Sequence, residues 1–209
     1  MNFGISLKLI LIYLSLHFNI LSQNNDIDLL KQINGSYTPQ GGKILTGLTN
    51  SVNLVGFGLP LGLFIAGKVS KNKEITLNSY ELFSSLALNA VITTSVKLAV
   101  SRPRPFVTYP NEIEKHAKAG SYSFPSGHTS MAFNSATSIS LLYPKWYVIA
   151  PAYIWACGIG YSRKYLGVHY PSDVLCGALF GSASAIGNHY LFKYFKRRNA
   201  KNQNSAPKI

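Results

Sequence analysis

The sequence predicts an all-α protein, a membrane-embedded helical bundle of five or six transmembrane helices, and three observations support this prediction. First, 47% of the 209 residues are hydrophobic and only 13% are charged. Second, the apolar residues form segments of helical length in which Ser, Thr, Asn and Gly are frequent, and small residues let membrane helices approach closely. Third, much of the formal net charge of +13 lies in the C-terminal tail, as is typical beside a cytoplasmic leaflet.

Residues 1–23 are mostly apolar, and Lys8 is a basic residue near the start of the segment. The apolar run over residues 5–21 has the length of a signal-peptide core, with a cleavage point near Ser22 or Gln23. The run is also only slightly shorter than the roughly 20 residues that a transmembrane helix needs. We therefore expect residues 1–23 to be a signal peptide or the first transmembrane helix, and both interpretations stay open.

The next segment, residues 22–45, is polar, and Gly, Asn and Pro interrupt any helical period. It is predicted to be a loop or a short surface helix. Two of the apolar segments that follow have only about sixteen residues, which leaves open a soluble all-α protein with buried helices. Five segments are predicted to be helices from their length and low charge: 48–67, 77–100, 128–143, 146–161 and 173–192.

The length predicts one domain, which we place at residues 24–192, followed by a basic tail at 193–209. If the apolar segments span a membrane, the turn over residues 68–74, the turn at Lys145 and the tail lie on one side. The Lys and Arg residues there predict that this side is cytoplasmic. The opposite side then carries the connections around residues 101–124 and 162–173, which are rich in groups that bind anions.

The composition argues against several other classes of site. Only seven residues are Asp or Glu, too few to build the cage of ligands that a two-metal phosphatase needs, so we expect no metal and no cofactor. Cys157 and Cys176 both lie in apolar runs, where packing is favoured over a disulfide or a metal site. A nucleic-acid-binding domain of this size would carry more charges of both signs, so nucleic acid is not an expected partner.

Three short motifs fall on the side opposite the basic tail. The first, KLAVSRPRP, ends one apolar helix and continues into a loop stiffened by prolines. The second is PSGH at residues 125–128, and the third is SRKYLGVHYPSD. The candidate site residues with polar side chains in these motifs are Lys97, Arg104, Ser126, His128, Ser162, Arg163, His169 and Asp173.

PSGH has the features of an anion site at the start of a helix. Pro125 suits the first turn of a helix, and the amides of Ser126, Gly127 and His128 would then be unpaired donors at its N-terminus. Gly127 lets a ligand approach the backbone closely. The motif therefore predicts a cradle for phosphate that also carries an imidazole.

Three of the basic residues in the motifs suit phosphate-ester chemistry. Its transition state spreads negative charge over three oxygens, so catalysis relies on positioning and on electrostatic stabilisation. Arg104 and Arg163 can each hold two oxygens with a planar fork, whereas Lys97 supplies a point charge. This charge needs no metal ion.

Together the motifs resemble the signature of the type-2 phosphatidic acid phosphatase (PAP2) family, which includes the bacterial class A acid phosphatases and the vanadium haloperoxidases. The signature reads Lys, six residues, Arg-Pro; then Pro-Ser-Gly-His; then Ser-Arg, five residues, His, three residues, Asp. The chain matches it in order over residues 97–173 without departure.

The resemblance implies roles for three of these residues. His169 would be the nucleophile that forms a phosphohistidine, and His128 the general acid. Asp173, four residues after His169, would hold one ring nitrogen protonated and leave the other free to attack. Arg102 has the wrong spacing from Lys97 for the signature, so we interpret it as a helix-end residue that reaches toward lipid headgroups.

The resemblance also implies an integral membrane phosphatase of the bacterial inner membrane, with its site facing the periplasm. Its substrate would be a phosphomonoester or diphosphate of a lipid: phosphatidic acid, phosphatidylglycerol phosphate, undecaprenyl diphosphate or a lipid A phosphate. Membrane lipids are the other expected partners, and the sequence predicts no oligomeric state. The alternative is a soluble periplasmic acid phosphatase acting on small phosphate esters. A non-catalytic membrane protein that binds anionic lipid is a rival of another class, and the small size disfavours a haloperoxidase.

Overall fold

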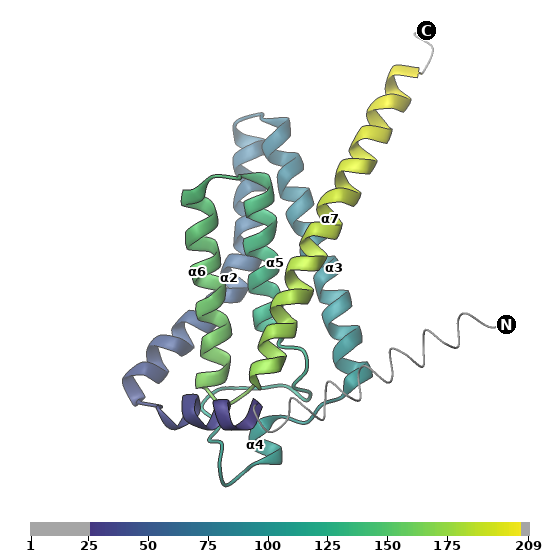
Figure 1. Cartoon of the computed structure of the whole chain (residues 1–209). Coiled ribbons are helices and arrows are strands. Elements are labelled where there is room, and N and C mark those ends of the chain that lie inside the picture. Colours follow the sequence, from purple (N-terminus) through teal and green to yellow (C-terminus); the bar gives the residue numbers. More distant parts are fainter. Residues whose placement is uncertain (1–25, 206–209) are drawn as a thin grey trace, which may run out of the picture.

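The computed structural model describes residues 26–205, with side chains described as far as residue 198, and this part of the chain is helical without strands. Residues 26–35 form a first helical segment. The signal peptide or first transmembrane helix expected at residues 1–23 lies outside the described residues. The helices that follow are α2 (Pro39–Val69), α3 (Lys73–Val100), α4 (Pro105–Thr108), α5 (Gly127–Leu142), α6 (Trp146–Tyr165) and α7 (Pro171–Ser205) (Figure 1).

All five predicted apolar segments are helical, and a short surface helix is present at residues 26–35, as one of the two predictions for residues 22–45 had it, but a second helix also reaches into that segment. The helix α2 already begins at Pro39, because the Thr38 side chain accepts a hydrogen bond from the Gly41 amide and caps it. The helix at residues 26–35 exposes one face, with Leu29 45% exposed, and buries the other. Its Leu30 is fully buried, in a cluster with Ile113 and Tyr170.

The connections separate to the two ends of the bundle as the sequence predicted. The α2–α3 turn, the α5–α6 turn and the C-terminal part of α7 lie at one end, at the top of Figure 1. The α3–α4 connection, the start of α5, the end of α6 and the start of α7 lie at the other end, beside residues 26–35. Helix α5 packs against α2, α3, α6 and α7. All three sequence motifs therefore meet at one end of the molecule.

The bundle has an unusual distribution of polarity. Large apolar side chains point outward along the helices, for example Leu54, Val91, Ile154 and Leu179, each more than half exposed. The interior holds many small polar residues, among them Ser79, Ser85, Asn89, Thr93, Ser130, Asn134, Ser138 and Ser184. Two of the described helical stretches, Pro39–Val69 and Lys73–Thr108, are also long and apolar enough to cross a membrane.

Hydrogen bonds between these small polar residues join α3, α5 and α7. The Asn134 amide donates to Ser85 Oγ at 2.9 Å and to Ser184 Oγ at 3.0 Å. Ser130 Oγ donates to Asn89 Oδ1 at 2.7 Å. Side-chain hydrogen bonds of this kind hold helices together where water is absent.

Two glycines of α7 bring it into direct contact with the backbone of α5. A methyl group at Gly177 would lie 2.7 Å from the carbonyl oxygen of Ser126, and one at Gly181 would clash with the carbonyl oxygen of Ser130. Because the opposing atoms are backbone, the helices have to separate to admit a larger side chain. The contact therefore sets where the start of α5 lies relative to α7.

We expect Gly181→Ala to destabilise the protein by about 1–3 kcal/mol, the usual range for overpacking. The matched control is Gly187→Ala on the same helix, since a methyl group there meets nothing within 4 Å. That control should leave stability unchanged or raise it by up to about 1 kcal/mol, because Ala favours a helix over Gly. Thermal unfolding of the two purified variants in detergent checks this, and equal midpoints would contradict the described packing.

Candidate functional site

Lys97 lies in the last turn of α3 and turns inward rather than toward solvent. Its Nζ donates hydrogen bonds to the carbonyl oxygens of Pro125 at 2.8 Å and Tyr122 at 3.0 Å, with Ser123 further away at 3.4 Å. The ammonium group thus ties the end of α3 to the loop that precedes α5. All of these acceptors are neutral, so the charge of Lys97 is not paired there.

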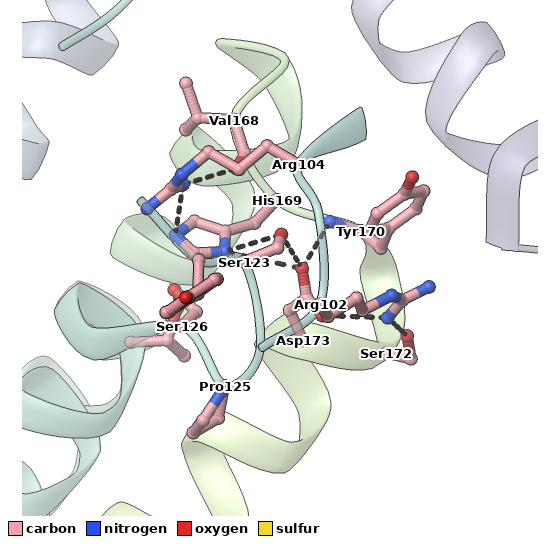
Figure 2. A network of polar contacts seen from close by, with 12 residues as sticks. Arg102, Arg104, Ser123, Pro125, Ser126, Val168, His169, Tyr170, Ser172 and Asp173 are labelled. Carbon is pink, nitrogen blue, oxygen red and sulfur yellow. Dashed lines mark hydrogen bonds and ion pairs between the residues drawn. The ribbon is translucent and has the colours of Figure 1, made fainter. Parts of the chain in front are cut away.

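Arg104 is the residue before α4 and is buried. Its Nε donates to the Gly120 carbonyl at 2.8 Å, and its Nη1 donates to the Val168 carbonyl at 2.7 Å. The same Nη1 lies 3.2 Å from Nε2 of His169 (Figure 2). The motif therefore brings this guanidinium against the histidine that lies 65 residues further along the chain.

The contact with Arg104 identifies the tautomer of His169. A guanidinium can only donate, so Nε2 must accept, and the proton of the neutral ring is then on Nδ1. Nδ1 faces the Asp173 carboxylate, 3.4 Å from Oδ2, and lies 3.5 Å from Ser123 Oγ. Burial lowers the pKa of His169 to about 4, and although the Asp173 carboxylate opposes this, Arg104 and Arg163 add to it. The ring is therefore neutral, with a lone pair on Nε2.

Asp173 is completely buried near the start of α7, and hydrogen bonds fix both of its oxygens. Oδ2 accepts from Ser123 Oγ at 2.5 Å and from the Tyr170 amide at 2.9 Å, in addition to its contact with His169. Oδ1 accepts from Arg102 Nη1 at 2.8 Å. The predicted pairing of Asp173 with His169 is present, with Ser123 and Arg102 as partners that the sequence did not indicate.

The PSGH motif starts a helix as predicted, but two details of the prediction were wrong. The helix α5 begins at Gly127 with Ser126 as its N-cap, so Pro125 precedes the cap instead of lying in the first turn. The Ser126 amide donates to the Asp173 carbonyl at 3.0 Å and is not a free donor. Gly127 and half-buried His128 are the first two helical residues, where backbone amides have no acceptor within the helix.

Arg163 lies in the last turn of α6 and is only 3% exposed. Its Nη1 donates to Thr49 Oγ1 of α2 at 3.0 Å. Its Nε is buried and has no hydrogen-bond partner in the described part of the chain. A buried donor without a partner is costly, so this guanidinium has unused binding capacity.

Arg102 was interpreted as a residue that reaches toward headgroups, and that interpretation was wrong. Its guanidinium bridges two carboxylates, with Nη1 2.8 Å from Asp173 Oδ1 and Nη2 3.1 Å from Asp26 Oδ2. It also lies over the Tyr170 ring, 3.8 Å from the centroid. The signal that could have indicated this role is the two-residue spacing in SRPRP, which lets both arginines reach the same region from a proline-stiffened segment.

The charges at this end of the bundle do not balance. Asp26 and Asp173 are both paired with Arg102, whereas within residues 26–198 no carboxylate lies at ion-pair distance from Lys97, Arg104 or Arg163. Buried charges normally have partners. The arrangement is therefore suited to hold an anion next to the unprotonated Nε2 of His169. No group of three or more His, Cys, Asp or Glu side chains that could hold a metal ion occurs among the searched residues.

An apolar groove of about 450 Å³ leads along α2, α3 and α5 to this region. Its walls are mostly apolar, and at one end it reaches Lys97 and Gly127. The lining residues are Phe57, Phe83, Leu86, Ala87, Asn89, Ala90, Thr93, Thr94, Lys97, Gly127 and Met131. A single groove therefore joins an apolar surface of the bundle to the cationic site.

Comparison with known proteins gives consistent matches. The PAP2 superfamily profile matches residues 79–197, which include all three motifs. An undecaprenyl-diphosphatase of Sulfolobus acidocaldarius is 36% identical over 101 residues, 48% of this chain and 48% of that protein. A lipid A 1-phosphatase of Rhizobium etli is 31% identical over 157 residues, 67% of this chain and 65% of that protein. The chain thus spans about half to two thirds of the length of these relatives.

Two crystal structures share the architecture. LpxE of Aquifex aeolicus superposes with a TM-score of 0.68 at 30% identity, over 79% of this chain and 94% of that one. A transmembrane PAP2-type phosphatidylglycerolphosphate phosphatase of Bacillus subtilis superposes with a TM-score of 0.65 over 93% of this chain and 96% of that one. The identity to the second is 23%, so that likeness concerns the fold alone.

Proposed function

The chain belongs to the PAP2 superfamily, and on this premise we propose that it is an integral membrane phosphatase that hydrolyses a phosphomonoester or diphosphate of a lipid. The observation that carries the proposal is the contact of Arg104 with the unprotonated Nε2 of His169, at an end of the bundle where Lys97, Arg104 and Arg163 have no carboxylate at ion-pair distance within residues 26–198. A phosphoryl group is an anion that needs this charge and an electrophile that needs this lone pair.

The proposed reaction has two steps through a phosphohistidine. His169 Nε2 attacks phosphorus while the bond to the leaving oxygen breaks, and His128 gives that oxygen a proton. Asp173, facing Nδ1–H, stabilises the positive charge that the ring acquires. His128 then takes a proton from water, which attacks the phosphohistidine and releases phosphate and the free ring. The cations and the Gly127 and His128 amides stabilise the phosphoryl oxygens in both steps, and we propose that no metal is required.

We place the bundle in the bacterial inner membrane, with the site toward the periplasm. Outward apolar side chains around an interior of small polar residues favour a lipid surrounding over a soluble protein. The α2–α3 turn, the α5–α6 turn and the C-terminal part of α7 as far as residue 205 lie at the end opposite the site, and their sequences are rich in Lys and Arg. Such an excess of basic residues is typical of the cytoplasmic side. In this proposal residues 24–192 form the catalytic domain. A carbonate wash of membranes that releases the protein would favour the soluble alternative.

The apolar groove supports a lipid substrate over a small phosphate ester. It ends at Lys97 and Gly127, so one hydrocarbon chain lying along α3 would bring its phosphate to the cationic site. From Phe83 to Lys97 the helix rises about 21 Å, a length that suits a long acyl or prenyl chain. The names of the relatives, an undecaprenyl-diphosphatase and a lipid A 1-phosphatase, also point to lipid phosphates. The four lipid substrates expected from the resemblance all stay candidates.

Filling the groove should separate lipid from soluble substrates. We expect Ala90→Trp to lower kcat/KM for a long-chain lipid phosphate at least about tenfold. The indole would displace part of the hydrocarbon chain from the groove, and the substrate would lose the binding free energy of several buried methylene groups. Hydrolysis of p-nitrophenyl phosphate should stay within about twofold of the wild type. The matched control is Val91→Trp, an adjacent, 64% exposed position outside the groove lining. Equal losses on both substrates would contradict a role of the groove in chain binding.

The acid limb of the pH profile should lie well below the range of an ordinary histidine. Burial lowers the pKa of His169 from 6.5 to about 4. The reactive lone pair is therefore lost to protonation only as the pH falls through that value. We expect kcat/KM on a soluble ester to show no acid-side decline between pH 7 and pH 5. A decline centred near 6.5 would contradict a buried, neutral His169 as the attacking group.

Phosphate release by the purified protein tests the proposed function. The substrates are the four lipid phosphates and p-nitrophenyl phosphate, each assayed with and without EDTA. The proposal predicts release from at least one lipid at a rate that EDTA leaves unchanged. Loss of activity with EDTA would contradict the metal-independent mechanism, and activity on the soluble ester alone would favour the acid phosphatase alternative.

A further inference from the structure

We propose that Asp26 is a positioning residue of this site, which acts through Arg102 to set the place and the effective charge of the Asp173 carboxylate beside His169. The inference rests on the proposed function, because its main readout is the rate of phosphate release. Asp26 lies outside the sequence motifs, on the helix of residues 26–35.

The contacts of Asp26 join that helix to the start of α7. Asp26 is 5% exposed, and its Oδ1 accepts from the Ser172 amide at 2.9 Å. Its Oδ2 accepts from the hydroxyl of Ser172 and from Arg102 Nη2, the latter at 3.1 Å. Because Ser172 is in the first turn of α7, Asp26 acts as an N-terminal cap supplied by another helix. That turn carries Asp173.

Arg102 transmits the effect to Asp173. Its Nη1 donates to Asp173 Oδ1 at 2.8 Å and to Ser172 Oγ at 2.7 Å, while Nη2 holds Asp26. The fork is also fixed from one side by the Tyr170 ring, 3.8 Å from the guanidinium carbon. Figure 2 shows Arg102 and Ser172 on the side of Asp173 that faces away from His169. Asp26 therefore affects the His169 ring indirectly, through Arg102 and Ser172.

The charge balance gives the expected direction of the effect. Two carboxylates share one guanidinium, so the group keeps a net negative charge while His169 becomes positive in the phosphohistidine. The other charged groups that act on His169, Arg104 and Arg163, are cations. Without the charge of Asp26, Arg102 neutralises Asp173 alone, and the positive ring loses stabilisation.

The test is a double-mutant cycle on the full-length protein in detergent, with kcat and KM measured on p-nitrophenyl phosphate at pH 7. Asp26→Asn keeps an oxygen for the Ser172 amide and removes only the charge, so kcat should fall about tenfold, the lower end of the effect typical of residues that support a reacting group through other residues. KM should stay within about twofold. In an Arg102→Gln background the same change should alter kcat less than about twofold, because the connection to Asp173 is already broken.

Asp28→Asn is the matched control, since Asp28 is on the same helix, 73% exposed, and near only Lys31 at 3.9 Å. It should behave as the wild type in every assay. An equal loss of kcat from Asp26→Asn with and without Arg102 would overturn the inference and leave the proposed function intact. So would a wild-type kcat in Asp26→Asn.

A second measurement does not need activity and separates this inference from the proposed function. In ¹⁵N-histidine NMR spectra, with His169 assigned from a His169→Gln variant, Asp26→Asn and Arg102→Gln should both shift the Nδ1 resonance of His169. Asp28→Asn should leave it in place. If the wild type released no phosphate from any substrate, the proposed function would fail, and unchanged Nδ1 shifts in both variants would overturn the inference independently.

Discussion

Replacing His169 with Gln is expected to reduce phosphate release at least about 10⁴-fold, because the proposed mechanism forms its covalent intermediate on this residue. His169 is the residue whose unprotonated Nε2 meets Arg104 at 3.2 Å while its Nδ1 faces Asp173. Gln has a similar size and can still donate to Asp173, so the fold should persist. Phosphate release and the thermal unfolding midpoint, measured on the same preparation, check both expectations.

The control for this variant is His116→Gln. His116 lies in the loop at the same end of the bundle, but its ring stacks on Tyr37, with the two ring centroids 3.4 Å apart. Its replacement should leave the rate within a few-fold of the wild type. Activity that survives in His169→Gln would exclude His169 as the nucleophile. An inactive wild type would instead favour the rival interpretation, a non-catalytic protein that binds anionic lipid.

Replacing Arg163 with Met is expected to move activity and stability in opposite directions. Activity should fall about 10³-fold, the lower part of the range for an arginine that stabilises a phosphoryl transition state. The protein without ligand should become more stable by about 1–3 kcal/mol, the cost of a buried group without its partners. Arg163 is 3% exposed, its Nε has no partner among the described residues, and only Thr49 is lost as a contact.

Arg104→Met is the informative comparison for that variant. Arg104 also supports the Gly120 and Val168 carbonyls, so its loss should lower both activity and stability. Steady-state rates and unfolding midpoints of the two variants separate the effects, with about 2–4 °C expected per kcal/mol for a chain of this size. A lower midpoint for Arg163→Met would show that the charge of Arg163 is already compensated in the protein without substrate.

The long helices were predictable because length, low charge and small-residue content are local properties of the sequence. The five apolar segments became α2, α3, α5, α6 and α7 for this reason. The start of α2 was missed because Gly41 and Gly42 suggested a loop, whereas the cap formed by Thr38 and Pro39 was the stronger signal. The burial of the helix at residues 26–35 was not predictable, since Leu30 is covered by residues as distant as Ile113 and Tyr170.

The site shows the same division between local and distant information. The motif residues could be grouped because each lies at or near the end of a helix, and the bundle brings those ends together. The partners that complete the site come from contacts across the chain. Arg102 and Asp26 are 76 residues apart, and the Ser126 amide donates a hydrogen bond to the carbonyl oxygen of Asp173, which belongs to another motif. The spacing of residues in the sequence does not predict contacts such as these two.

The most direct test of the account is detection of a phosphorylated His169. In a His128→Ala variant given p-nitrophenyl phosphate, the leaving group departs without an acid, but water is no longer activated, so the phosphoenzyme should accumulate. Digestion at alkaline pH and mass spectrometry should then find one added phosphoryl group on the peptide that contains His169, and none when His169→Gln is combined with it. A phosphoryl group on any other residue, or its absence while p-nitrophenol is released in a burst, would contradict the account.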